Sequence, residues 1–80
     1  MPKLPQVSGE RLVGLLKSLD YEVVRQRGSH IRLKKLTALG EHAVTVPAHK
    51  VVAKGTLGDI VGRVSLWNNI SREELIRRLR

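Results

Sequence analysis

His30 is the residue of this 80-residue chain whose type and surroundings best suit proton-transfer chemistry. It follows Gly28 and Ser29, and between residues 22 and 35 five Lys and Arg side chains oppose one acid, Glu22. The unperturbed pKa of histidine lies near neutrality, so an imidazole can take or give a proton under physiological conditions. Neighbouring cations would stabilise the negative charge that builds on a reacting phosphate. The pattern makes His30 a candidate for catalysis on an RNA backbone, but on spacing alone an ordinary surface histidine at a turn is the favoured interpretation.

Basic residues are also in excess over the chain as a whole. Fifteen Lys and Arg against seven Asp and Glu give a formal net charge of +8. Each Lys or Arg that meets a phosphate releases condensed counterions, so a nucleic acid is the expected partner. The alternatives are a basic surface that only confers solubility and a positive patch that meets an acidic protein. The candidate RNA-binding residues are Arg25, Arg27, Ser29, Arg32, Lys34, Lys35, His49 and Lys54.

The other two histidines are weaker candidates. His49 lies beside Lys50 and could serve as a partner acid or bind phosphate. His42 shares strand parity with Val44 and Val46, which favours packing or partial exposure. The histidine spacings fit no helix-borne pair of metal ligands, and neither acids nor cysteines gather around them. No metal or other cofactor is expected.

Other familiar chemistries lack their residues. The acids are scattered, apart from Glu73 and Glu74, which are better explained by a helix cap. Two-carboxylate hydrolysis is therefore not expected. Ser29 and His30 do not form a nucleophile–base pair, because adjacent residues of a strand point to opposite faces. The Gly55 region lacks the pattern of a phosphate-binding loop.

The elements that would position His30 can be read from the hydrophobic pattern. Ser8 is a plausible N-cap for a helix of about 12 residues. Asp20 is its expected stop. Strands are predicted over residues 21–26, 30–36 and 42–46, with a turn at Gly28-Ser29 and a loop over residues 37–41. Along the second strand Ile31 and Leu33 point one way, and the other face carries His30, Arg32 and Lys34.

Two helices are predicted to follow the strands. The first begins near Thr56 as N-cap, with Leu57, Ile60, Val61 and Val64 on one stripe. Residues 67–69 are then predicted to form a turn, and Ser71 opens a last helix with a capping box. The predicted fold is α+β, with helices on one face of a three-stranded antiparallel sheet in the order α-β-β-β-α plus a short C-terminal helix. Residues 1–80 are expected to form a single domain.

Composition also indicates the compartment. The chain has no cysteine, and its first residues lack the apolar segment of a secretory signal. No apolar run approaches the roughly 18 residues that a membrane span requires. A cytoplasmic protein without a membrane partner is expected.

An ordered set of motifs resembles the HicA family of toxin ribonucleases, the mRNA interferases of toxin–antitoxin pairs. The motifs are Ser8-Gly9-Glu10-Arg11-Leu12, Val23-Val24-Arg25-Gln26-Arg27-Gly28-Ser29-His30, Val44-Thr45-Val46-Pro47-Ala48-His49, Lys54-Gly55-Thr56-Leu57 and Ile70-Ser71-Arg72-Glu73-Glu74-Leu75. They cover nearly the whole chain. The sequence departs from the family at Asp20, where a glycine is usual, at Gly58-Asp59, and in the apolar stretch 36–41.

The resemblance implies a core like that of double-stranded-RNA-binding domains and a ribonuclease activity that stops translation by cutting mRNA. It implies that the histidine of Gly-Ser-His, His30, is catalytic, that no metal or organic cofactor takes part, and that a HicB-type antitoxin covers the active face. Two alternatives from the residues alone stay open. One is a non-catalytic RNA-binding module that uses the same basic face. The other is a DNA-binding protein, for which the helices give weaker support.

Overall fold

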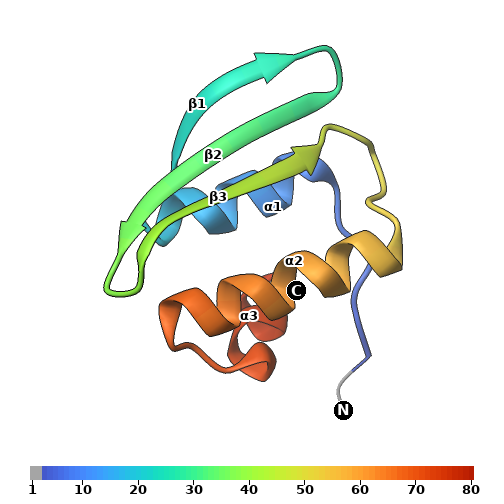
Figure 1. Ribbon diagram of the computed structural model, residues 1–80. Coiled ribbons are helices and arrows are strands. Elements are labelled where there is room, and N and C mark those ends of the chain that lie inside the picture. The colour runs from blue at the N-terminus through green and yellow to red at the C-terminus, as the bar shows by residue number, and fades with distance from the viewer. Residues whose placement is uncertain (1–2) are drawn as a thin grey trace.

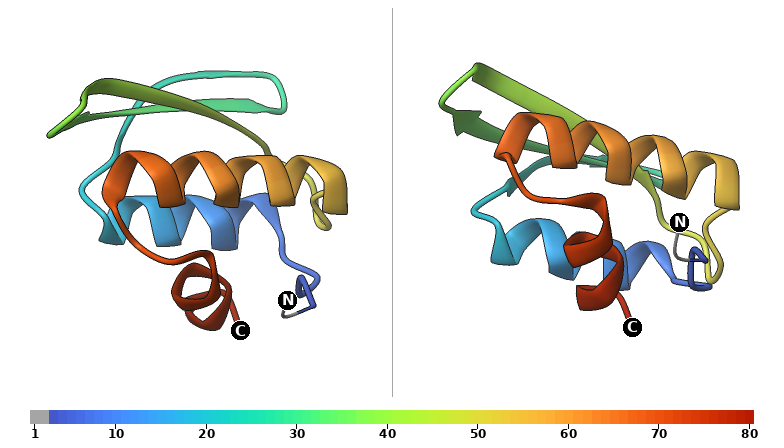
Figure 2. Two further views of the ribbon diagram at one scale, coloured as in Figure 1. Left: turned by 60° about the horizontal axis from the view of Figure 1, so that its bottom comes forward. Right: turned by 90° about the horizontal axis from the view of Figure 1, so that it is seen from below.

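The helices lie on one side of a three-stranded sheet and leave its other face open; the first two pack against the sheet, and the last packs on the side of these helices that is away from the sheet (Figure 1; Figure 2). The computed structural model describes residues 3–80. Its elements are α1 (Gly9–Ser18), β1 (Glu22–Arg27), β2 (His30–Thr37), β3 (Gly40–Pro47), α2 (Lys54–Asn68) and α3 (Arg72–Arg78). The strands lie in the order β1-β2-β3 and are antiparallel. The predicted α+β fold and element order are confirmed.

Helix α1 begins and ends where the sequence predicts. The hydroxyl of Ser8 accepts a hydrogen bond from the amide of Arg11 at 3.0 Å, which satisfies one of the free N–H groups of the first turn. After the helix Asp20 has a φ of +73°, in the left-handed region that favours glycine. The aspartate that stands where the resembling family usually has glycine therefore has left-handed backbone.

The β1–β2 hairpin turns through two residues. Gly28 has a φ of +57°, which a glycine adopts without strain, and Arg27 lies opposite His30. The alternation predicted for β2 is confirmed, because Leu33 is fully buried and Ile31 is half-buried against the core.

The β2–β3 connection is shorter than predicted. The expected loop over residues 37–41 is a tight turn, with Thr37 paired to Gly40 as the last strand residues. The Thr37 hydroxyl donates to the Gly40 carbonyl at 2.8 Å and accepts from the Leu39 amide at 3.1 Å. These two bonds pair polar groups within the turn. Both strands therefore continue further than the sequence pattern indicated, up to the Thr37 and Gly40 pair.

Helix α2 begins earlier than predicted, and Thr56 is not its N-cap. The helix starts at Lys54, and Ala53, whose methyl side chain cannot accept a hydrogen bond, occupies the cap position. Thr56 therefore lies in the first turn. Asp59 pairs with Arg63 one turn later at 3.2 Å. The start was misplaced because an alanine cap carries no sequence signature.

The end of α2 also differs from the prediction. Trp67 and Asn68 are helical rather than part of a turn, and only Asn69 has left-handed backbone, with a φ of +53°. Helix α3 then starts as expected, since the Ser71 hydroxyl accepts from the Glu74 amide at 3.1 Å. The predicted box is half-formed, because the Glu74 carboxylate bonds arginines of α3 instead.

The core lies between the sheet and the helices. The largest fully buried side chains are Leu12, Leu16, Leu33, Val46, Val52, Leu57, Val61, Val64 and Leu75. The predicted stripe of α2 is among the buried residues, as expected. Within residues 3–80, no helix has the length and apolar character needed to cross a membrane.

Candidate nucleic-acid interface and active site

The open face of the sheet carries the predicted basic residues of β1 and β2. Leu33 points into the core, so strand alternation turns its neighbour Arg32 to the open side. The register places Arg25 opposite Arg32 and Arg27 opposite His30. All four of these polar side chains are exposed.

These residues line a depression at the hairpin end of the open face. Its volume is about 250 Å³, and its lining residues are Arg25, Arg27, His30, Arg32 and Thr45. Guanidinium groups stay protonated and donate hydrogen bonds in a planar fork that fits phosphate oxygens. His30 is the lining side chain whose imidazole can both accept and donate a proton. The depression therefore combines phosphate binding with one proton-transfer group.

Thr45 is a lining residue that sequence reasoning missed. It lies opposite Arg32 on β3, between the buried Val44 and Val46. Strand alternation would have placed it on the open face, so the signal was present in the parity of the third strand.

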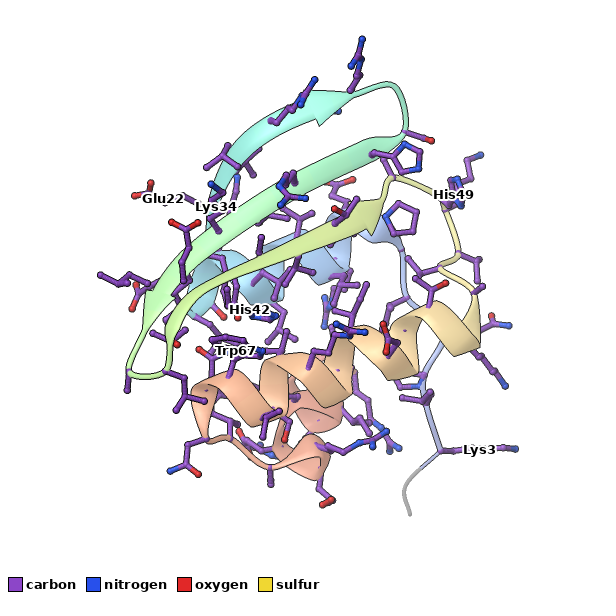
Figure 3. All side chains as sticks on the ribbon, viewed as in Figure 1. Lys3, Glu22, Lys34, His42, His49 and Trp67 are labelled. Carbon is purple, nitrogen blue, oxygen red and sulfur yellow. The ribbon has the colours of Figure 1, made fainter. Side chains whose placement is uncertain are left out.

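Lys34 shares the open face but lies further along β2, away from the hairpin end. Figure 3 shows it near Glu22, far from His49. Its Nζ is 3.3 Å from the Glu41 carboxylate, and both side chains are well exposed. Such a surface pair contributes at most about 1 kcal/mol, so a phosphate could replace the carboxylate.

Lys35 is not brought together with His30. It lies on the core side of β2, where its Nζ donates to Asn68 Oδ1 and sits 5.7 Å from the centre of the Tyr21 ring. It ties the sheet to the end of α2. Proximity in sequence to His30 was misleading here, because consecutive strand residues face opposite sides.

Ser29 and His49 lie at the same end of the sheet as the depression. The amide of Ala48 donates to the Ser29 carbonyl at 2.6 Å, and the amide of Gly9 donates to the His49 carbonyl at 2.9 Å. The His49 side chain is exposed, and Figure 3 shows it just beyond the end of β3, beside the β1–β2 turn. Lys54 is also exposed but opens α2, on the helical side of the molecule.

His42 packs in the interior, as strand parity predicts. It is 6% exposed, its Nδ1 lies 2.7 Å from the Tyr21 hydroxyl, and its ring stacks on Trp67 at 4.8 Å. Asn68 Nδ2 donates to the Tyr21 oxygen, which directs the hydroxyl proton to His42. Burial lowers the pKa of His42, and the Arg63 charge lowers it further. Both effects favour the neutral form of this imidazole, which holds the sheet to α2 (Figure 3).

Metal-ligating side chains do not gather in the described part of the chain. Within residues 3–80, no three His, Cys, Asp or Glu side chains lie close enough to hold an ion. Glu74 of α3 binds arginines instead. Arg77 and Arg78 contact the Glu74 carboxylate at 2.7 and 2.8 Å. Their hydrogen bonds hold the pKa of the Glu74 carboxyl below its usual value, and the larger effect comes from Arg77.

The topology and the open face define a class: a small α+β domain with arginines around one histidine on its uncovered sheet. Comparison with known families identifies it further. The family model of the HicA toxin of bacterial toxin–antitoxin systems matches residues 9–65, which include both His30 and His49. The chain belongs to the HicA toxin family, as its motifs indicated. Comparison with curated proteins and with solved structures gives no significant match. Membership implies an antitoxin partner.

Proposed function

We propose that this protein is an endoribonuclease toxin, an mRNA interferase that cuts RNA with His30 and without a metal ion. One observation carries the proposal: His30 lines a depression whose other charged lining groups are three arginines, Arg25, Arg27 and Arg32. A phosphodiester bound there meets fixed positive charge and one group able to move a proton. The HicA toxin family, to which the chain belongs, supports this reading.

The chemistry follows from the groups present. Cleavage of RNA by its own 2′-hydroxyl needs a proton removed from that hydroxyl and a proton supplied to the departing 5′-oxygen. His30 performs one of these transfers. The guanidinium groups remain charged throughout and stabilise the extra negative charge of the transition state. Preorganised donors of this kind typically contribute about 10²–10³-fold in rate.

The RNA path we propose runs along the hairpin end of the open face. Arg25, Arg27 and Arg32 bind the phosphates at the cleavage site, and Lys34 contacts the strand further along the sheet. Ser29 and His49 contact the RNA next to the cleavage site, and Lys54 extends the track around the edge toward α2. Lys35 is outside this interface, because it faces the helices and bonds Asn68.

The antitoxin we propose is of the HicB type and covers the open face. A partner that places acidic groups over the three arginines would both mask the depression and exclude RNA. The target is mRNA in the cytoplasm. Steep salt dependence of binding is expected for RNA and antitoxin alike.

The requirement for the 2′-hydroxyl of the substrate at the cleavage site provides a test of the proposal. The cleavage site is first mapped on a set of transcripts, and an oligonucleotide spanning it is then made with and without the 2′-hydroxyl at that site. In excess chelator, the protein should cut the first and leave the second intact. Cleavage of the deoxy substrate would contradict the mechanism. Tight RNA binding without any cleavage would leave a non-catalytic RNA-binding module, and equal affinity for RNA and DNA would remove RNA as the target.

A further inference from the structure

The loop that leaves β3 is held at two points. The Ala48 amide donates to the Ser29 carbonyl at 2.6 Å, which ties the loop to the turn just before His30. One residue later, the Gly9 amide donates to the His49 carbonyl at 2.9 Å, which ties the loop to the first residue of α1. Both bonds use backbone atoms, so the His49 side chain stays free while its Cα is fixed.

The contact with α1 is close enough to demand glycine. A Cβ on Gly9 would lie 2.1 Å from the Pro47 carbonyl oxygen and 2.9 Å from the Ala48 Cα. Both of these are backbone atoms that no rotamer change can move. The helix and the loop therefore meet backbone to backbone, which gives His49 a rigid base rather than a mobile one.

The register then fixes the position of His49 relative to His30. His30 is the cross-strand partner of Pro47, two residues before His49. From the usual cross-strand spacing and the maximum reach of two residues, the His30 and His49 Cα atoms are at most about 13 Å apart. Two histidines held within such a span can both contact one bound phosphodiester group.

We propose that His49 is the second proton-transfer residue of the active site, the general acid that protonates the leaving 5′-oxygen, with His30 as the general base. This assignment rests on the ribonuclease function proposed above. The arginines of the depression already supply positive charge to the phosphate. A second group that can release a proton is what the reaction still needs, and the side chains that line the depression with His30 are the hydroxyl of Thr45 and the guanidinium groups of Arg25, Arg27 and Arg32.

The step balances in atoms and charge. The neutral imidazole of His30 takes the proton of the 2′-hydroxyl as the 2′-oxygen forms a bond to phosphorus. The bond between phosphorus and the 5′-oxygen breaks, and the imidazolium of His49 gives its proton to that oxygen. The products are a 2′,3′-cyclic phosphate and a free 5′-hydroxyl. His30 ends protonated and His49 neutral, and exchange with water restores both.

A leaving group that needs no proton separates a general acid from a residue that only binds. The mapped RNA oligonucleotide is prepared with its normal 5′-oxygen at the cleavage site and, separately, with sulfur in place of that oxygen. A thiolate departs without protonation. The test compares the parent protein with His49→Gln, which keeps both backbone ties, with His30→Ala, and with Lys50→Gln, which removes a charge from the same loop. Each variant is first checked for folding by its unfolding transition.

For His49→Gln we expect a loss of about 10²–10⁴-fold on the oxygen substrate. On the sulfur substrate the loss should shrink to within about tenfold of the parent, because no proton is required there. Lys50→Gln should change the cleavage rates of the oxygen and sulfur substrates by the same factor. Equal losses on both substrates for His49→Gln, or no loss on either, would overturn the assignment. His30→Ala should lose activity on both, and full activity of that variant would instead overturn the proposed function itself.

Discussion

Replacement of Gly9 by alanine should destabilise the protein, although alanine is the better helix former. The new Cβ would lie 2.1 Å from the Pro47 oxygen, and ordinary contact begins at 3.4 Å, so backbone must separate by about 1.3 Å. That movement breaks the bond from the Gly9 amide to the His49 carbonyl, at a cost of about 0.5–1.5 kcal/mol. Overpacking adds about 1–3 kcal/mol, against a gain of at most about 1 kcal/mol in helix propensity. We expect a net loss of about 1–3 kcal/mol.

Gly14 provides the matched control in the same helix. A Cβ at Gly14 would meet no other atom of residues 3–80 within 4 Å, apart from its own helix and chain neighbours. Gly14→Ala should therefore express the propensity gain alone and stabilise the protein by about 1 kcal/mol.

Urea unfolding followed by the fluorescence of Trp67 measures both changes. Trp67 is the only tryptophan and stacks on His42 between the sheet and α2, so its emission reports loss of the core. The urea concentration at the unfolding midpoint should be highest for Gly14→Ala, intermediate for the parent and lowest for Gly9→Ala. A Gly9→Ala protein as stable as the parent would refute the close contact between α1 and the loop, and with it the fixed position of His49.

Three further predictions test other parts of the structure. Burial lowers the pKa of His42 in the folded protein, so this side chain binds a proton more readily in the unfolded chain. The free energy of unfolding should therefore fall as the pH drops below about 6.5, and urea titrations at several pH values should show a weaker dependence for His42→Phe. Asp20→Gly should stabilise the protein by up to about 1 kcal/mol by relieving the positive φ, and an unchanged midpoint would argue against that strain. Arg32→Ala should reduce the slope of log affinity for RNA against log salt by about 1, whereas Lys35→Ala should leave that slope unchanged and lower stability.

The elements with side-chain signatures were predictable from the sequence. Ser8 and Ser71 cap α1 and α3 because their hydroxyls accept amide bonds, and that preference is local. The alternation of β2 placed Leu33 inside and Arg32 outside, because one face of an antiparallel sheet meets the core. The arginine cluster around His30 could be predicted from this strand alternation and from a two-residue turn between β1 and β2.

The rest depended on interactions that leave no side-chain signature. The start of α2 has an alanine at its cap, so nothing in the sequence marked it. Lys35 was grouped with His30 by nearness in sequence, while its partner Asn68 is 33 residues away. The ties that hold His49 run between backbone atoms of segments distant in sequence, Gly9 and the loop after β3. Long-range backbone contacts of this kind become visible only in three dimensions.

The rate of RNA cleavage by the parent protein and by His30→Ala, measured side by side in excess chelator, tests the central claim most directly. The side chain of His30 is exposed, so its removal should leave the fold intact, as matching urea midpoints would verify. We expect cleavage by the parent and a loss of at least about 10²-fold in the variant, with RNA affinity largely retained. Equal cleavage by both folded proteins would contradict the central claim.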